Sequence, residues 1–277
     1  MTIIPPIKTQ WIKTKLMDFI KFNLPNQTNW KWIEPFLWSW VVWFNLAWKE
    51  AIFADSNPHL INFYNALNSW TISSCIVRNF LEKEWKELSE KGVIHYQYIR
   101  DRFNDTWNPL DFLFLNRSCF NWMIRFNRKW WFNVPFCKKN DRFSKSYITK
   151  IVNQVDKIQS LMQQNHRTFI CQDFQKTIWM GNPIDFIYAD PPYIGRHVDY
   201  YDSWCEENEV LLRDSLIQFW WKFMVSTRFW NKYRQNVYID TLWKDFSIQT
   251  MEHFYFVWGK EDNRNIMLEA IIMNYSL

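Results

Sequence analysis

Residues 184–193 read IDFIYADPPY, a largely apolar run that ends at an acid followed by two prolines. Aromatic and β-branched residues in such a run are typical of a strand buried on both faces of a parallel sheet. We therefore predict a strand over residues 184–189. Asp190 and the three residues after it then lie at the carboxyl end of that strand, the edge where open α/β sheets bind their ligands.

The chain before this motif alternates between strand and helix patterns. Residues 32–36 are a short apolar run, and a helical stretch follows at 41–46. Residues 51–55 read AIFAD, a second buried strand that ends in an acid. The residues 56–58, Ser-Asn-Pro, then cap a helix over 60–67, because Ser or Asn satisfies free amides and Pro fits the first turn. This order predicts a doubly wound, Rossmann-like α/β sheet.

Residues 71–155 interrupt the alternation. Three helical patterns come first, at roughly 74–90, 94–103 and 109–121. A basic, aromatic-rich, extended stretch follows at 124–136 and predicts a β-hairpin. We therefore expect a mostly helical inserted domain at 71–155, between two parts of a catalytic domain at 1–70 and 156–277.

The α/β pattern resumes after the insert. We predict a helix over 145–164, a strand over 168–171 and the strand that leads to Asp190. Two apolar segments at 254–257 and 267–273, separated by a polar turn, predict a C-terminal antiparallel hairpin.

The sequence from Asp190 to Tyr193 suits chemistry on an aromatic amine, whose lone pair is delocalised into its ring. The Asp190 carboxylate and the Pro191 carbonyl can accept both amino hydrogens and leave the lone pair directed at a methyl donor. Pro191 and Pro192 make the segment rigid, and Tyr193 offers a face for a base extruded from DNA. The alternative interpretation is a turn that only closes the strand.

In context, these residues resemble the Dam-like D12 class of adenine-N6 DNA methyltransferases, with the motif order known as α, and among them the EcoRV-type modification methylases. The resemblance covers nearly the whole chain. Residues 5–10 with Lys13 and Lys15 resemble the N-terminal cofactor motif of the family. Residues 34–37 with Ser39 resemble its glycine-rich cofactor loop, and residues 190–193 resemble its catalytic motif.

The resemblance implies S-adenosylmethionine as cofactor, with Asp55 on the ribose hydroxyls and Asp173-Phe174 at the adenine ring. An acid at the end of the second strand independently suits a ribose diol. The alternatives are a helix-capping role for Asp55 and an ordinary strand end at Asp173. The implied catalytic residues are Asp190, Pro191, Pro192 and Tyr193. The implied cofactor contacts are Gln10, Trp11, Lys15, Glu34, Pro35, Phe36, Ser39, Asp55, Asp173, Phe174 and Asp190.

The insert resembles the target-recognition domain of the family over residues 116–121, 125–129 and 132–136, and its charge supports that role. Nine basic residues and one acid lie between Arg117 and Lys150, a net charge of +8, which leaves −3 for the rest of a +5 chain. Such a footprint suits DNA phosphates, although a solvated basic loop is the alternative. The predicted DNA-binding residues are Lys8, Arg117, Asn121, Arg125, Asn127, Arg128, Lys129 and Asn133.

The composition departs from the family in one respect, because the chain has 20 Trp and only 4 Gly. We interpret the pattern as replacement of glycine by tryptophan in an otherwise intact methylase sequence. A base-stacking surface is the alternative. An indole in the cofactor loop is expected to weaken cofactor binding. The positions where the family has glycine are Trp11, Trp38, Trp40, Trp122, Trp130 and Trp131, and we extend this interpretation to Trp43 and Trp258.

Together these features predict an enzyme that transfers a methyl group from S-adenosylmethionine to the amino nitrogen of an adenine flipped out of duplex DNA. We expect it to be the modification half of a restriction-modification system, acting at GATATC or another GAT-containing site. A DNA-binding protein without catalysis is the first alternative. Methylation of RNA adenine or of cytosine N4 is the second, which the position of the insert disfavours.

Five cysteines without the short spacings of a zinc or redox site predict free thiols in a reducing cytosol and no metal. The chain has no uninterrupted apolar stretch of about eighteen residues and no apolar N-terminal leader, so we expect neither membrane insertion nor export. We therefore expect a cytoplasmic monomer, encoded by a bacterium or a phage. Its expected partners are double-stranded DNA and, in the cell, a cognate restriction endonuclease.

Overall fold

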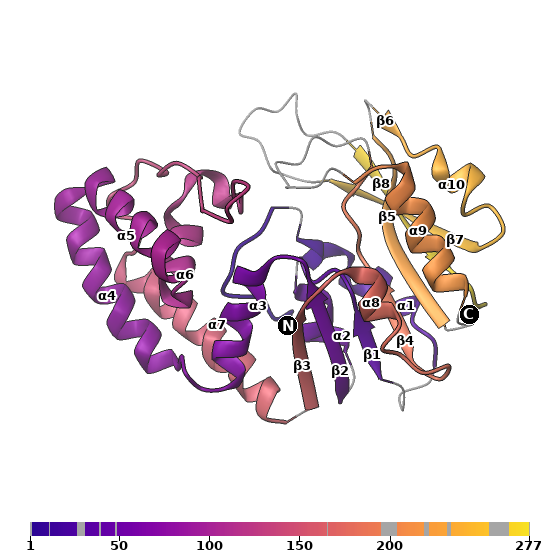
Figure 1. Ribbon diagram of the computed structural model, residues 1–277, viewed down its shortest axis with the longest axis horizontal. Helices are drawn as coiled ribbons and strands as arrows, with labels where there is room; N and C mark the ends of the chain where they lie inside the picture. Colours follow the sequence, from indigo (N-terminus) through magenta and orange to yellow (C-terminus); the bar gives the residue numbers. More distant parts are fainter. Residues whose placement is uncertain are drawn as a thin grey trace. The chain divides into compact units, whose positions relative to one another are not determined.

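The computed structural model describes residues 2–10, 12–26, 31–38, 40–47, 49–164, 166–194, 204–218, 222–231, 234–254 and 266–276 (Figure 1). These residues form two compact units. The helical unit contains segments 1–12 and 57–165, and the sheet unit contains segments 13–56, 166–197 and 203–277. The helical unit thus includes segments before and after the predicted insert as well as the insert itself. The boundaries of a target-recognition domain at 71–155 stay a prediction.

The sheet unit is built on a mostly parallel sheet. Its strands are β1 (Trp32–Glu34), β2 (Glu50–Asp55), β3 (His166–Cys171), β4 (Phe186–Ala189), β5 (Lys222–Asn231), β6 (Arg234–Gln235), β7 (Ser247–Phe254) and β8 (Ile266–Met273). They follow the order β3-β2-β1-β4-β5-β8-β7, and β6 pairs with β5. The neighbours from β3 to β5 are parallel, whereas β8 is antiparallel to both β5 and β7. This order confirms the predicted Rossmann-like sheet with a C-terminal antiparallel hairpin.

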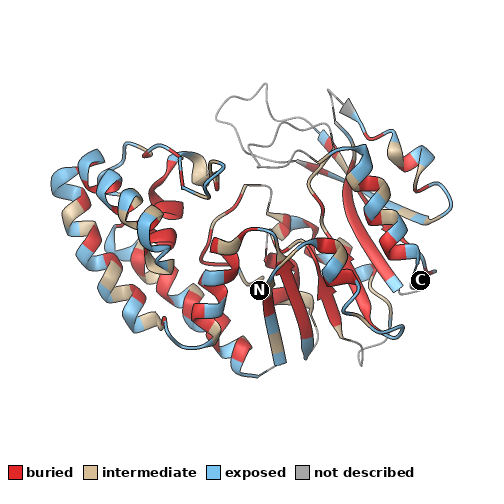
Figure 2. Ribbon diagram, viewed as in Figure 1, coloured by how far each residue is buried: buried red, intermediate tan, exposed pale blue. Residues whose placement is uncertain are grey.

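The strand order reverses between β1 and β4, and this reversal positions the site. In a doubly wound sheet, ligands bind outside the carboxyl ends of the strands at this switch point. All four residues of β4 are buried, as the apolar run predicts, so its carboxyl end is held rigidly by the core (Figure 2). Residues that follow β1 and β4 therefore meet at the switch point.

Helices complete the sheet unit. They are η1 (Lys13–Leu16), α1 (Met17–Phe22), α2 (Val41–Leu46), α8 (Phe174–Ile178), α9 (Glu206–Ile217) and α10 (Tyr238–Thr241). One core cluster packs Ile33 and Ile187 of the sheet with Leu212 and Leu216 of α9, all with 0% exposure. Burial of such side chains contributes about 1.5–3 kcal/mol each, so α9 is fixed firmly on the sheet.

The predicted C-terminal hairpin exists, but its first strand was placed too late. β7 spans Ser247–Phe254, whereas the sequence predicted a strand at 254–257. β7 lies at the edge of the sheet, and the polar residues of its SIQTMEHF sequence weaken the apolar signal. Residues 255–257 lie outside the described part of the chain.

The helices of the helical unit are α3 (Pro58–Asn68), α4 (Ser74–Lys91), α5 (Val93–Thr106), α6 (Pro109–Ser118), the short η2 (Phe120–Trp122) and α7 (Lys145–Gln163). Of these, α4, α5 and α6 are the three helices predicted for the insert. The Asn57 side chain accepts hydrogen bonds from the amides of His59 and Leu60, which is the predicted cap of α3. α6 ends at Ser118, earlier than the predicted residue 121, because Cys119 is extended and Asn121 has φ of 50°.

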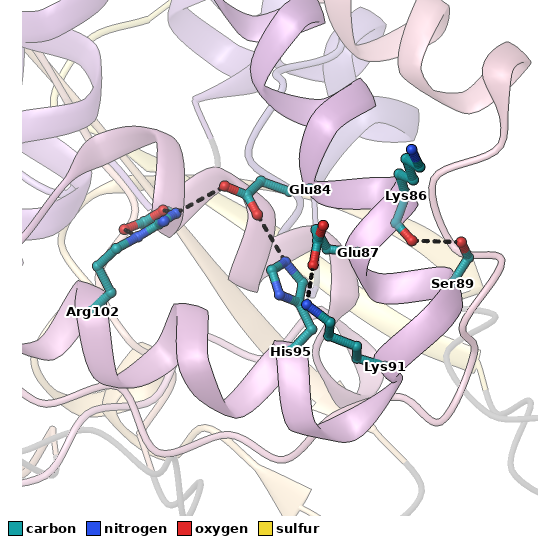
Figure 3. Close-up of polar contacts among 8 residues, drawn as sticks. Glu84, Lys86, Glu87, Ser89, Lys91, His95 and Arg102 are labelled. Carbon is teal, nitrogen blue, oxygen red and sulfur yellow. Dashed lines mark hydrogen bonds and ion pairs between the residues drawn. The ribbon is translucent and has the colours of Figure 1, made fainter.

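A buried charge cluster joins α4, α5 and α6 (Figure 3). Glu84 Oε2 lies 2.8 Å from His95 Nε2, and Arg102 donates to Glu84 Oε1 at 3.2 Å and to Asp111 Oδ2 at 2.8 Å. Because Glu84 and Asp111 are 2% and 1% exposed, loss of a partner would leave a carboxylate buried without compensation. Such losses cost about 3–5 kcal/mol, so the cluster fixes the register of these three helices.

Residues 124–136, which we call the reading arm, form a hairpin with little regular strand. Its described pairing is the single bridge Phe126↔Phe132, and a second bridge joins Cys119 to Phe136. The predicted β-hairpin is therefore present as a chain reversal rather than as two continuous strands. Side chains of neighbouring helices form hydrogen bonds with several of its backbone groups instead.

Tryptophans occupy backbone geometry that normally belongs to glycine. The described non-glycine residues with positive φ are Trp40, Trp70, Trp107, Asn121, Trp122, Trp130 and Lys138, so five of the seven are Trp. The left-handed region costs an L-residue roughly 1–2 kcal/mol. This finding supports the interpretation that tryptophan has replaced glycine. Trp43 instead lies inside α2, and Trp11 and Trp258 lie outside the described residues.

Candidate active site

Asp190 follows the last residue of β4 at the switch point of the sheet. Its side chain is 10% exposed, and the next residue, Pro191, is buried. Burial raises the pKa of the Asp190 carboxyl, the ammonium of Lys13 opposes that rise, and the charge of Glu269 adds to it. Pro191 and Pro192 have no N–H group, so they cannot donate hydrogen bonds to the carbonyl groups of this segment. Asp190 therefore offers acceptors in a dry environment.

One buried ammonium organises the polar groups at this site. Lys13 Nζ donates to Ser226 Oγ at 2.6 Å and to the Tyr193 hydroxyl at 2.7 Å, and it lies 3.0 Å from Asp190 Oδ1. The Tyr193 hydroxyl in turn donates to Glu269 Oε2 at 2.7 Å. Lys13 is 2% exposed, and an ammonium has three N–H donors. Three acceptors thus match its full capacity.

A second carboxyl lies at the end of the neighbouring strand. Glu34 ends β1 and is 1% exposed. Burial raises its pKa well above the usual range, and the charge of Asp190 adds to that effect, while a 3.0 Å hydrogen bond from Trp32 Nε1 opposes it. The raised pKa means that Glu34 favours its uncharged form. The ammonium of Lys13 forms ion pairs with Asp190 and Glu269 instead.

Aromatic rings and acids lie at the same edge of the sheet. Phe36, just after β1, stacks on Phe174 of α8 with ring centroids 5.2 Å apart. Asp55 ends β2, and Asp173 caps α8 through a 2.8 Å hydrogen bond from the amide of Gln175. Acids for a ribose diol beside apolar ring faces suit an adenosyl group. These residues fit the cofactor that the sequence predicts.

Sequence reasoning missed Trp204 as a neighbour of these rings. Its indole packs edge-on against Phe36 at 5.4 Å and lies 5.6 Å from Phe174. Glu209 fixes the indole by accepting from Trp204 Nε1 at 2.6 Å, and it also accepts from Trp243 Nε1 at 2.9 Å. A tryptophan two residues before α9 gives no motif that would predict this contact.

The other predicted cofactor residues have the following surroundings. Lys15 is exposed on η1, because the turn of this 3-10 helix directs Lys13 inward instead. Gln10 belongs to the helical unit, where its Nε2 donates to the carbonyl of Asn121 at 3.2 Å. Pro35 is buried directly after β1. Trp11 and Ser39 lie outside the described residues.

The predicted contact between Arg117 and DNA conflicts with its burial. Arg117 is 2% exposed, and its guanidinium donates to the Pro6 carbonyl at 2.6 Å, to Gln154 Oε1 at 2.7 Å and to the Tyr147 hydroxyl at 3.1 Å. These bonds hold the N-terminal segment against α6 and α7. Arg117 therefore has a structural position rather than one open to a phosphate.

Lys8 lies near this cluster and is half-buried. The amide of Lys8 donates to Asn116 Oδ1 at 2.8 Å, and its ammonium lies 3.2 Å from the centroid of the Trp122 ring. Burial, together with the charges of Arg117 and Arg142, lowers the pKa of Lys8 to about 7. The charge of Lys8 therefore depends on pH in the neutral range.

The remaining predicted DNA residues lie on the reading arm, except Asn121 just before it. Arg128 and Lys129 are exposed at its tip. Arg125 Nε donates to Asn133 Oδ1 at 2.8 Å, which orients the two side chains together. Asn127 Oδ1 accepts from the amides of Lys129 at 2.8 Å and Trp131 at 3.1 Å, so its side chain shapes the turn.

Comparison with known proteins agrees with these observations. The model of the D12 class N6 adenine-specific DNA methyltransferase family matches residues 12–257. The chain belongs to this family. No group of three or more His, Cys, Asp or Glu side chains that could hold a metal ion occurs among the described residues, and none of the described helices is long and apolar enough to span a membrane.

Three relatives illustrate the similarity. The chain is 29% identical to the Retron Ec67 DNA adenine methylase of Escherichia coli, over 74% of this chain and 69% of the relative. It is 32% identical to a DNA adenine methylase of Vibrio cholerae, over 65% of this chain and 62% of that one. It is 25% identical to the type II methyltransferase M1.LlaDCHI of Lactococcus lactis subsp. cremoris, over 96% of this chain and 94% of that one.

The matches to the DNA adenine methylases of Vibrio cholerae and Haemophilus influenzae span 62–63% of those relatives' own length, which is less than two thirds. Among solved structures, an rRNA methyltransferase, aviRa from Streptomyces viridochromogenes, aligns over 97% of this chain and 87% of its own with a TM-score of 0.41 and 10% identity. The fold assignment therefore depends on the strand order described above.

Proposed function

We propose that this chain is a site-specific, adenine-specific DNA methyltransferase that transfers a methyl group from S-adenosylmethionine to N6 of an adenine flipped out of duplex DNA. The observation that carries the proposal is the buried Asp190–Lys13–Tyr193 cluster at the switch point of the sheet, in a chain of the D12 family. The cluster supports the proposal because ligands of α/β sheets bind at this edge, where the Asp190 carboxylate is an acceptor.

The chemistry follows from what these groups can do to an aromatic amine. The Asp190 carboxylate and the Pro191 carbonyl accept the two amino hydrogens and localise the nitrogen lone pair. Lys13 is a positioning residue, because its charge favours the ionised form of the buried Asp190. The methylated amine must release one proton, and Asp190, whose pKa is raised by burial, is the base that accepts it.

S-adenosylmethionine, when bound, supplies an electrophilic methyl group on sulfur. In the proposal Asp55 accepts from its ribose hydroxyls, and Phe36 and Phe174 enclose its adenine ring. Glu34, Pro35, Asp173 and the loop after β1 complete that pocket. Tyr193 provides a ring face for the extruded base.

In the proposal, the reading arm and Lys8 bind double-stranded DNA. The exposed Arg128 and Lys129 contact phosphates, and Arg125 with Asn133 reads base edges. We propose the same biological setting that the sequence predicts: a cytoplasmic monomer of bacterial or phage origin that protects GATATC or a related site alongside a restriction endonuclease.

A DNA-binding protein without catalysis is the second candidate, and the loop after β1 favours it. Trp40 has φ of 56° and is completely buried, where its ring packs on Phe169 at 5.7 Å. Glycine in this loop would let the backbone approach the cofactor without strain.

Calorimetric titration with S-adenosylmethionine separates the two candidates. We expect the Trp38→Gly, Trp40→Gly variant to bind S-adenosylmethionine at least about a hundredfold more tightly than the chain itself, a gap of about 2.7 kcal/mol. Circular dichroism first shows that both proteins are folded. Absence of binding by both would leave only the DNA-binding candidate, and equal affinities would show that the indoles do not obstruct the cofactor.

A further inference from the structure

Three helix side chains hold the backbone of the reading arm at alternate residues. His59 Nε2 donates to the carbonyl of Trp130 at 2.9 Å. Asn104 Oδ1 accepts from the amide of Phe132 at 2.7 Å, and its Nδ2 donates to the carbonyl of the same residue at 3.4 Å. The Tyr96 hydroxyl donates to the carbonyl of Val134 at 2.7 Å. These are the arm clamps: His59 of α3, and Tyr96 and Asn104 of α5.

The clamps fall on the inward-facing half of the arm. Phe132, Val134 and Phe136 are 1%, 0% and 7% exposed. Trp131 and Asn133, on either side of Phe132, are exposed. This period of two is that of an extended strand, although the arm has a strand partner at single bridges alone among the described residues. The side chains of the clamps take the place of a strand partner and satisfy backbone groups that would otherwise be buried unpaired.

His59 is built into this arrangement with a defined proton position. It is 1% exposed and lies among aromatic rings, with Phe126 and Trp107 both at 4.5 Å. Its Nδ1 has no hydrogen-bond partner among the described residues, and a carbonyl can only accept, so Nε2 carries the proton. Burial lowers the pKa of His59 to about 4. The imidazole is therefore neutral near pH 7, and in this form it donates its hydrogen bond to the carbonyl of Trp130.

We propose that His59, Tyr96 and Asn104 are positioning residues for target recognition: they hold the reading arm in a fixed extended geometry, so that Arg125, Trp131 and Asn133 face DNA in register before it binds. The proposal rests on the proposed function of the arm in DNA binding. Base edges are read by hydrogen bonds with strict geometry, whereas phosphate attraction tolerates a displaced side chain. Loss of a clamp should therefore reduce sequence selectivity more than it reduces total affinity.

Substitution of Asn104 tests this directly. Asn104→Leu removes both hydrogen bonds to Phe132, and Asn104→Asp keeps the acceptor for its amide. The matched control is Asn62→Leu, because Asn62 Nδ2 donates to the carbonyl of Trp107 at 3.0 Å in the same unit but outside the arm. His59→Phe keeps an aromatic ring among its neighbours and removes the donor to Trp130.

Each protein is first shown folded by circular dichroism and then binds a random-sequence duplex library, from which the bound fraction is sequenced. We expect the parent chain to enrich one motif, and Asn104→Leu and His59→Phe to enrich it at least tenfold less while binding the whole library within about threefold of the parent. Asn104→Asp and Asn62→Leu should enrich the motif within about threefold of the parent.

Equal enrichment by the parent, Asn104→Leu and His59→Phe would overturn the proposal. Equal loss in Asn62→Leu, with a similar fall in melting temperature, would assign the effect to general stability and would also overturn it. If the parent binds the library but enriches no motif, the proposed site-specific function fails as well. The parent result therefore distinguishes failure of the function from failure of the clamps.

Discussion

The Lys13 ammonium lies 3.0 Å from the Asp190 carboxylate, although the two residues are 177 positions apart in sequence. Both side chains are nearly excluded from solvent, and the Lys13 ammonium opposes the rise that burial causes in the pKa of Asp190. An acceptor that must remain ionised in a dry site needs such a counter-ion.

Removal of Lys13 should therefore shift the pH dependence of methyl transfer. Burial already raises the Asp190 pKa, and Lys13 opposes that rise, so Lys13→Met raises it further. Because the reaction needs ionised Asp190, the acidic limb of the kcat profile moves to higher pH, and kcat at pH 7 falls. Lys13→Arg keeps the charge and should shift the limb less. An acidic limb that stays in place in Lys13→Met would show that Lys13 does not set the Asp190 charge.

DNA affinity should depend on pH through Lys8. Burial and neighbouring cations lower its pKa to about 7, so Lys8 is mostly neutral at pH 8 and mostly charged at pH 6. Its contribution to phosphate binding is therefore larger at pH 6. Anisotropy titrations at constant ionic strength should show a smaller gain in affinity from pH 8 to pH 6 for Lys8→Met than for the parent. The same gain in both proteins would place the titrating group elsewhere.

The tip of the reading arm should carry part of the salt dependence of DNA binding. Arg128 and Lys129 are both exposed, and each phosphate contact adds about 0.9 to the slope of log affinity against log salt. We expect Arg128→Ser, Lys129→Ser to weaken binding and to reduce the slope by about 1–2. Lys83→Ser, Lys86→Ser, on the exposed surface of α4, is the matched control. An unchanged slope would move the DNA surface away from the tip.

The positive φ of Trp70 gives a stability test of the glycine interpretation. Trp70 has φ of 59° and is 49% exposed, whereas Trp179 is 57% exposed with φ of −71°. The free energy of unfolding should be about 1 kcal/mol larger for Trp70→Gly than for Trp70→Ala, because only glycine enters the left-handed region without cost. At position 179 the order should reverse. Denaturant unfolding of the four variants measures both differences, and alanine preferred at both positions would refute the interpretation.

The sequence was sufficient to predict the sheet and the position of Asp190 at its carboxyl edge because their signal is local. The FIYA run of β4 is buried at every residue, and an acid directly after a buried strand lies at the carboxyl edge in any doubly wound sheet. The hairpin of β7 and β8 was predicted with the wrong first strand, since an edge strand carries little apolar signal.

The side chains around Asp190 were harder to predict. Lys13 and Lys15 are chemically identical, and only the phase of a four-residue 3-10 helix decides which of them is buried. Arg117 is one of the nine basic residues counted between positions 117 and 150. A count of charges does not show that its guanidinium already donates to Pro6, Tyr147 and Gln154. The clamps on the reading arm depend on contacts 28 to 71 residues apart, which no motif spacing reveals.

The central claim is tested most directly by mass spectrometry of nucleosides from duplex DNA incubated with S-adenosylmethionine. The experiment uses the chain, its Trp38→Gly, Trp40→Gly variant, and the same proteins with Asp190→Ala. We predict N6-methyladenine as the methylated base, in larger amount with the glycine variant, and loss of the product by more than tenfold in Asp190→Ala while DNA binding is largely kept. N4-methylcytosine as the product, no methylated base with either parent, or methylation by Asp190→Ala within tenfold of its parent would contradict the account.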